Sequence, residues 1–132
     1  MKLSGMFLIA SIVVCNFSFA DDWPQFLGPD RNSTSAESDL LRSWPESGPE
    51  VMWKVAVGKG YGGPVVKEGK VYLLDRDDQV GEALRCFNLD DGEELWSYAY
   101  EAVGSVMFPG SRGVPTIDGG YVFTCGHNGD LH

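Results

Sequence analysis

Residues 69–96 decide the fold and read GKVYLLDRDDQVGEALRCFNLDDGEELW. The stretch contains three short apolar runs, at 71–74, 83–87 and from Leu95 onward. Each is rich in the aliphatic, aromatic or β-branched residues that favour strands. Turn-forming residues separate the runs, and the pair Asp91-Gly92 is a strong signal for a tight turn. The sequence therefore predicts three strands of an antiparallel meander, at 70–76, 83–89 and 94–100.

The flanks of this stretch repeat one pattern. Residues 64–72 read PVVKEGKVY and residues 115–123 read PTIDGGYVF, so Pro, two β-branched residues, a turn, Val and an aromatic residue recur. Trp53 and Trp96 form a second repeated pair. A repeat of about 40–50 residues with about four short strands is typical of β-propeller blades. The first unit is predicted to comprise strands at 64–67, 70–76, 83–89 and 94–100, and the second to begin with strands at 114–117 and 121–125.

Residues 51–57 read VMWKVAV and predict another strand, placed before the first unit. Because its Trp53 corresponds to Trp96 in the outermost strand of a unit, we expect a ring-closing strand that joins the last blade. A further strand is expected to start at Leu131. Residues 51–132 are thus predicted to contain a closing strand, a first blade and an incomplete second blade.

The first 20 residues predict a secretory signal peptide. Lys2 supplies the positive start, residues 6–15 form an apolar core, and Ser18-Phe19-Ala20 suits cleavage before Asp21. The alternatives are a buried apolar helix or a lipidated Cys15. Residues 21–50 are rich in Pro and Gly, which exclude a long helix, and the sequence predicts an extended arm whose aromatic rings dock on the β scaffold. We expect export to the periplasm or the extracellular space, engagement of the export machinery by the signal peptide, and no transmembrane segment in the mature chain.

Charge and cysteine usage narrow the function. The chain has a net charge of −9 with 10 Lys and Arg against 19 Asp and Glu, so we expect no nucleic-acid binding, which relies on basic side chains. Outside the signal peptide only Cys86 and Cys125 occur. Both lie in predicted strands and are expected to be buried free thiols, although an exported protein could also pair them as a disulfide.

Several candidate sites carry weak signals. Gly58, Gly60 and Gly63 match the spacing of a nucleotide-binding fingerprint, but Pro64 and β-branched residues follow instead of a helix, so a flexible bend is predicted. The carboxylates at 75, 77 and 78 lack the later ligands of a calcium loop and predict a solvated turn. His127 and His132 lie in or beside a Gly-rich turn and are a weak signal for metal binding. Arg112 is a candidate for reaching a central channel.

One motif resembles a known family. Residues 86–96, CFNLDDGEELW, resemble the tryptophan-docking motif A-x-D-x-x-T-G-x-x-x-W of pyrroloquinoline-quinone (PQQ) propeller repeats. Gly92 and Trp96 match it, whereas Asn88 replaces Asp, Asp91 replaces Thr and Cys86 replaces Ala. The resemblance extends over residues 51–132, and residues 23–29, WPQFLGP, resemble the opening of exported PQQ-like proteins of planctomycete type. It implies an all-β, partial PQQ-like propeller of antiparallel four-stranded blades, with Asn88, Asp91, Gly92 and Trp96 as a structural docking motif.

The same resemblance leaves the function divided between two classes. The first is an exported binding or interaction scaffold whose protein or small-molecule ligand the repeat does not specify. The second is the N-terminal part of a PQQ-dependent dehydrogenase that oxidises an alcohol and passes electrons to a cytochrome; only this class implies PQQ and calcium. No residue is assigned a catalytic, cofactor-binding or metal-ligating role. Because one complete unit is fewer than a closed propeller needs, we expect an N-terminal fragment that does not fold stably alone.

Overall fold

The computed structural model describes residues 21–38, 40–77, 79–102, 104 and 107–132. The predicted signal peptide lies outside these residues. Six strands and no helix are present in the described part of the chain, which confirms the all-β class. The strands are β1 (Val65–Lys67), β2 (Lys70–Asp77), β3 (Gly81–Asn88), β4 (Glu94–Tyr100), β5 (Thr116–Asp118) and β6 (Tyr121–Phe123).

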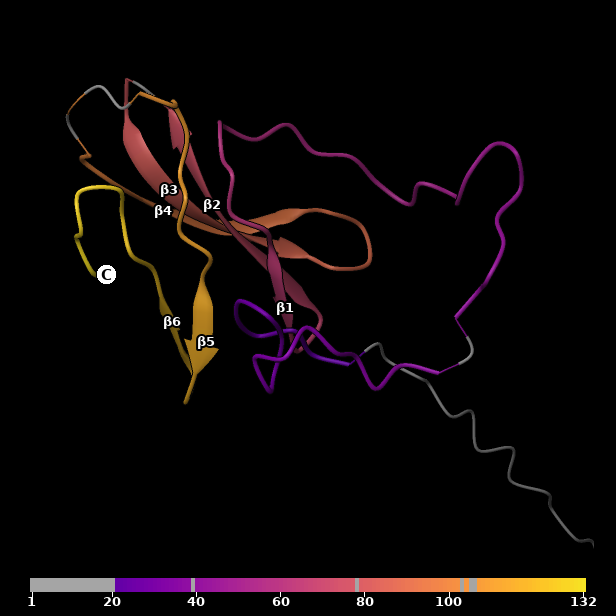
Figure 1. Ribbon diagram of the computed structural model, residues 1–132. Coiled ribbons are helices and arrows are strands. Elements are labelled where there is room, and N and C mark those ends of the chain that lie inside the picture. Colours follow the sequence, from indigo (N-terminus) through magenta and orange to yellow (C-terminus); the bar gives the residue numbers. More distant parts are fainter. Residues whose placement is uncertain (1–20, 39, 78, 103, 105–106) are drawn as a thin grey trace, which may run out of the picture.

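The first four strands form one antiparallel meander in the order β1-β2-β3-β4 (Figure 1). β2 and β3 pair along their whole length, from Lys70 opposite Asn88 to Asp77 opposite Gly81. β3 and β4 pair with one register irregularity between Cys86 and Phe87. This sheet is the blade that the sequence predicted, and β4 has the predicted bounds. β3 starts two residues earlier than expected because β2 continues through Asp77 to meet it.

The repeated pattern forms two equivalent hairpins. In the first, Val65 pairs with Tyr72 and Val66 with Val71. In the second, Thr116 pairs with Phe123 and Ile117 with Val122, which is the same register one repeat later. Both hairpins turn through two residues of positive φ, Glu68-Gly69 and Gly119-Gly120, the conformation that suits the twist of adjacent strands. The sequence repeat is therefore a structural repeat.

A shared apolar core joins the two units. Leu74, Leu84, Tyr100 and Ala102 are buried together, and Val122 of β6 packs against them. Burying such side chains stabilises a fold by about 1.5–3 kcal/mol each. The second hairpin is thus held against the first sheet by side-chain packing, because no strand of one sheet pairs with a strand of the other in the described residues.

The start of the arm ties the same two units together through its backbone. Trp23 exchanges two hydrogen bonds with Val66 of β1, of 2.8 and 3.0 Å. The next carbonyl, that of Pro24, accepts a hydrogen bond from the Ile117 amide of β5 at 2.9 Å. Two successive arm residues therefore bridge the first strands of both hairpins.

The rest of the arm and the segment after it differ from the predictions. Phe26 and Trp44 are more than half exposed, so the expected docking of aromatic rings holds for Trp23 but not for these two. Residues 51–57 form no strand. A strand needs a neighbour with free backbone groups, and the chain between residues 40 and 57 runs wide of both sheets for much of its length (Figure 1).

Candidate functional site

Two glycine-rich segments from different units lie side by side at one end of the blade. The Tyr61 amide donates to the Ser111 carbonyl at 2.7 Å, and the Ser111 amide donates to the Lys59 carbonyl at 3.1 Å. Lys59 in turn exchanges two hydrogen bonds of 2.9 Å with Arg76 near the end of β2. The contact requires glycine, since a Cβ on Gly62 would lie 2.2 Å from the Gly113 carbonyl oxygen. The backbones therefore approach more closely than any side chain would allow.

This contact supports a surface pocket of about 480 Å³ lined by Tyr61, Met107, Phe108 and Arg112, here called the cup. Three of the four lining side chains are large and apolar or aromatic, and all three are more than half exposed. Arg112 is also exposed, and among the described residues that line the cup it is the one that carries a full charge at neutral pH. The sequence singled out Arg112 and the glycines at 58–63 separately; it carried no signal that the two segments meet.

The turn between β3 and β4 holds three of the four predicted docking-motif residues. The Gly92 amide donates to the Asn88 carbonyl, and the Asn88 amide donates to the Glu93 carbonyl. Side-chain oxygens of Asn88 and Asp91 each accept a hydrogen bond from the amide two residues later. These local bonds explain why Asx residues and glycine occur at these positions.

The tryptophan that lies over this turn is Trp53. Its indole nitrogen donates to the Leu89 carbonyl at 2.8 Å, and a Cβ on Gly92 would lie 2.6 Å from its ring. Trp96, the tryptophan of the motif itself, lies on β4 opposite Cys86 and packs edge-on against Tyr72 with 6.0 Å between ring centroids. The structure thus brings Asn88, Asp91 and Gly92 together and places Trp96 apart from them.

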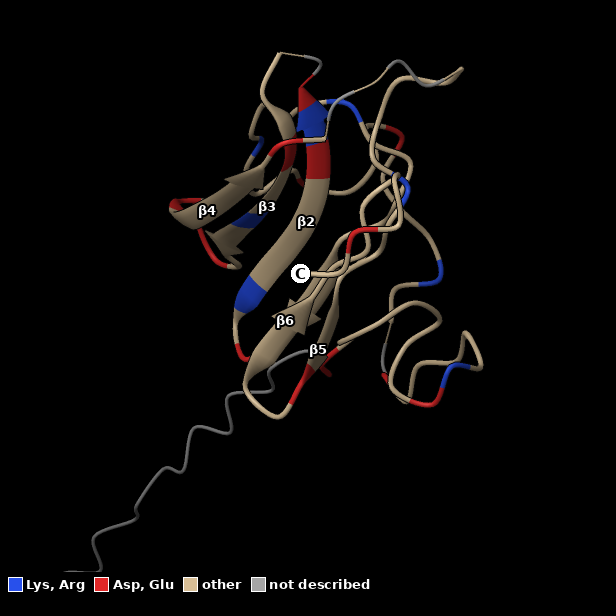
Figure 2. Cartoon of the chain, turned by 90° about the vertical axis from the view of Figure 1, so that its left-hand side faces the viewer, with Lys and Arg blue, Asp and Glu red and all other residues tan. Residues whose placement is uncertain are grey.

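Asp75 corrects the prediction of a solvated acidic turn. The residue lies within β2 and is 1% exposed. Its Oδ2 atom accepts hydrogen bonds from Arg85 Nε at 2.7 Å and from the Gly58 amide at 2.6 Å. Arg85 extends the pair to Glu94 at 3.1 Å, and the bond to Asp75 is the main cause that raises the Arg85 pKa. Acidic and basic residues follow one another along this end of β2 (Figure 2), and the pairing explains how charge is tolerated inside the sheet.

A second buried polar cluster lies between the units and was not predicted. Glu82 is fully buried at the start of β3, and its Oε2 atom accepts hydrogen bonds from the Tyr100 hydroxyl and the His127 amide, both at 3.1 Å. Burial, and after it the charge of Glu82, raises the pKa of Tyr100 to about 12. The ring of His132 stacks on Tyr100 at 3.9 Å. The two histidines of the predicted Gly-rich turn therefore pack against the blade.

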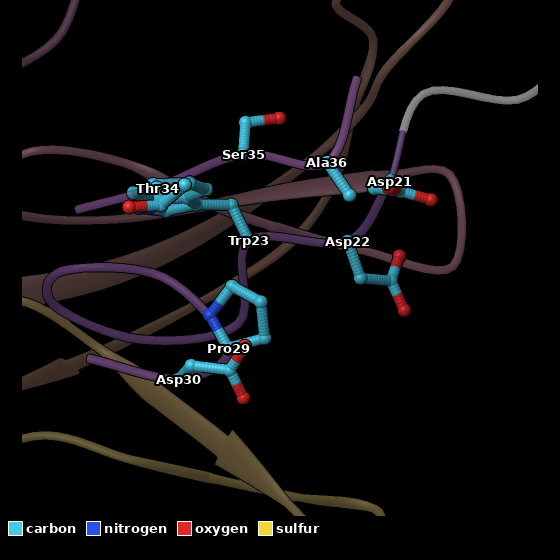
Figure 3. Close-up of a pocket in the computed structure, with 8 residues that line it drawn as sticks. All are labelled: Asp21, Asp22, Trp23, Pro29, Asp30, Thr34, Ser35 and Ala36. Atoms are coloured by element: carbon cyan, nitrogen blue, oxygen red, sulfur yellow. The ribbon is translucent and has the colours of Figure 1, made fainter. Parts of the chain in front are cut away.

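The arm forms a pocket of its own, lined by residues from the range 21–36 (Figure 3). Asp21, Asp22 and Asp30 line it, but Asp22 already pairs with Lys67 Nζ at 3.3 Å and accepts the Glu68 amide at 2.9 Å. In the part of the chain that the structure describes, no group of three or more His, Cys, Asp or Glu is arranged to hold a metal ion. This pocket is part of how the arm is anchored.

The two cysteines outside the predicted signal peptide are free thiols. Cys86 is buried beside Tyr72, and burial raises its pKa. Cys125 differs from the prediction because it is exposed: β6 ends at Phe123, and Cys125 forms only an isolated bridge with Leu131.

Comparison with protein families identifies the repeat. A family model of PQQ-like repeats, described as outer membrane protein assembly factor BamB, matches residues 29–132. The chain belongs to this PQQ-like repeat family. The resemblance drawn from residues 86–96 is thereby confirmed, together with the partial propeller fold. No curated protein and no solved structure matches the chain significantly.

The cofactor in the name of the PQQ-like family can be tested against the cup. PQQ enzymes hold the quinone next to Ca²⁺, which requires six to eight oxygen ligands, with carboxylates prominent among them. The described residues that line the cup offer one guanidinium, two aromatic rings and a thioether, and none of these residues is a carboxylate. The donor set of the cup does not fit a calcium–quinone pair.

Proposed function

We propose that this PQQ-like repeat protein is an exported scaffold that binds a protein partner at the cup. The observation that carries the proposal is the exposure of the cup's apolar residues: Met107 is 88% exposed, Tyr61 64% and Phe108 58%. A contiguous patch of exposed apolar side chains on a protein surface marks a site of protein contact. Tyrosine, phenylalanine, methionine and arginine are also the residues enriched at the centres of protein interfaces.

The backbone behind the cup supports a binding role. The Tyr61 amide itself donates to the Ser111 carbonyl, and Arg112 directly follows Ser111. Gly110 packs against Gly60 and Tyr61. A surface that is already ordered loses less conformational entropy when a partner binds. The family description supports the same role, since it names a factor that assembles outer-membrane proteins.

Export rests on the predicted signal peptide and on the family. No helix in the described residues is both long and apolar enough to cross a membrane. N-terminal sequencing of protein recovered from the cell envelope or medium is expected to begin at Asp21. Recovery of the chain from the cytoplasm with Met1 intact would refute export.

Crosslinking within the envelope tests the scaffold. A photo-reactive phenylalanine analogue in place of Phe108 is expected to capture one defined protein. The same analogue at Phe26, which is equally exposed but outside the cup, is the matched control. The captured protein, once purified, should bind the chain and lose binding on Phe108→Ala but not on Phe26→Ala.

Two results would contradict the scaffold. Identical crosslinks from positions 108 and 26 would show that the cup selects no partner. Reduction of a dye by the protein with PQQ, Ca²⁺ and an alcohol would instead support the dehydrogenase class, because that turnover needs a cofactor site that a scaffold lacks.

A further inference from the structure

The cup combines an apolar wall with one positive charge. Among the described residues, none of the ion pairs involves Arg112, although the chain has 19 acidic residues to 10 basic ones. An arginine set among Tyr61, Met107 and Phe108 has apolar neighbours on one side and water on the other. The complementary ligand therefore has an apolar group and a negative charge close together.

The guanidinium of Arg112 recognises carboxylates and phosphates alike, and an unmodified polypeptide offers only the carboxylate. The planar fork of the guanidinium donates two parallel hydrogen bonds to a carboxylate, and such bonds are stronger than those between neutral groups. In a polypeptide, one residue carries both an apolar side chain and a carboxylate only at the C-terminus. Aspartate and glutamate side chains offer the charge without the apolar group, so they can pair with Arg112 but cannot fill the apolar part of the cup.

The exposure of the cup favours a chain end over a free small molecule. Sites for small molecules enclose most of their ligand, about 70–90% of its surface. The walls of the cup are themselves largely in water, and Phe108 is the least exposed of the three at 58%. An open cup of this kind can hold one terminal residue while the rest of the chain leaves through the mouth and contacts the surrounding surface.

We propose that the cup binds the C-terminal residue of the partner's polypeptide chain. The apolar side chain of that residue packs against Tyr61 and Phe108, and its α-carboxylate pairs with Arg112. This inference rests on the proposed scaffold function and adds the part of the partner that is recognised. It is one form of the chain-end capture that peptide-binding proteins use.

Peptide binding to the purified protein tests the inference. The probes are fluorescent pentapeptides of sequence Gly-Ser-Gly-Ser-Phe, one ending in a free carboxylate and one in an amide. Fluorescence anisotropy is expected to show binding of the acid that is at least about 10-fold tighter than that of the amide, the effect of one charge-assisted contact. A third peptide that ends in serine acid should bind as weakly as the amide.

Substitutions locate the effect. Arg112→Gln is expected to remove the preference for the acid, and Arg112→Lys should keep part of it because lysine supplies charge without the fork. Arg42→Gln removes the same charge from an exposed position outside the cup and should leave the preference unchanged. Both positions are at the surface, and circular dichroism checks that each of the three variants is folded.

Three results would overturn the inference. The first is equal binding of acid and amide. The second is displacement of the acid peptide by free hydrocinnamate as effectively as by unlabelled peptide, which would assign the cup to small carboxylates. The third is a partner that crosslinks at position 108 and still binds after removal of its last residues; the scaffold function would then stand without chain-end recognition. Peptide binding as expected, with unspecific crosslinking, would instead refute the scaffold and keep the carboxylate site.

Discussion

Replacement of Gly92 by alanine tests the contact between the β3–β4 turn and Trp53. Gly92 has a φ of +75°, and an added Cβ would lie 2.6 Å from the indole ring. The substitution therefore combines two costs: a backbone conformation that L residues rarely adopt, and displacement of the ring that covers the turn. Gly69 separates these costs, since its φ is +71° and nothing lies within 4 Å of its Cβ position.

The magnitudes follow from these two environments. An alanine in the left-handed region costs roughly 1–2 kcal/mol, which is the whole expected effect of Gly69→Ala. Displacing Trp53 also breaks its hydrogen bond to Leu89, worth about 1 kcal/mol. The loss of part of the ring's burial adds about 1 kcal/mol more, below the full value for a buried aromatic side chain. Gly92→Ala should therefore destabilise by about 3–4 kcal/mol.

Urea unfolding of the full-length protein, followed by circular dichroism, measures these values without relying on tryptophan fluorescence. The informative comparison is Gly92→Ala in the Trp53→Ala background. There the ring is already absent, so the second substitution should cost only about 1–2 kcal/mol, as Gly69→Ala does. The resulting coupling energy of about 2 kcal/mol is within the range for residues in contact. If Gly92→Ala cost the same as Gly69→Ala, to within about 0.5 kcal/mol, in both backgrounds, Trp53 would not be seated on this turn.

Substitutions at three further positions test the packing of the blade. Tyr100 has a folded pKa of about 12 against an ordinary 10.0. Its neutral hydroxyl therefore stabilises the folded state below pH 10, and that contribution is lost as the pH rises to about 12. In Tyr100→Phe the midpoint pH of alkaline unfolding should be higher. Asp75→Ala should destabilise by about 2–4 kcal/mol because it removes the acceptor of Arg85 Nε and of the partly buried Gly58 amide. Asp75→Asn, which keeps an oxygen, should cost less than half of that in urea unfolding. Trp96→Ala should cost about 1–2 kcal/mol, below the 3–5 kcal/mol of a fully buried tryptophan, because the side chain is 40% exposed; a larger loss would show that another element covers it.

The blade could be predicted because its signals are local. Strand-forming runs, and turns at Glu68-Gly69 and Gly119-Gly120, specify which residues pair before any distant contact forms. β4 has the predicted bounds, and the other strands differ by a few residues at their ends. The docking-motif turn was also visible, because the hydrogen bonds of Asn88, Asp91 and Gly92 all have their partners within residues 88–93.

Predictions failed where a residue's environment comes from a distant segment. Residues 51–57 have no ladder partner among the described residues, and because they were predicted to pair with the last blade, that pairing stays a prediction. Asp75 resembles a turn residue by composition, but Arg85 and Gly58 satisfy it inside the sheet. Nothing in the sequence singled out Glu82 as buried, because its hydrogen-bond donors Tyr100 and His127 are distant from it along the chain.

The amino-acid sequence alone determined the repeat, the strand order of one blade and the PQQ-like family. These properties depend on β propensity, turn chemistry and motif spacing, all of which act over a few residues. Only the tertiary structure decided that Tyr61 and Arg112 share one cup and that Trp53 covers Gly92. Both contacts depend on glycines that let two distant backbones, or a backbone and a ring, approach within a distance that a Cβ would prevent. Such complementarity is a property of surfaces that meet only after the units have packed.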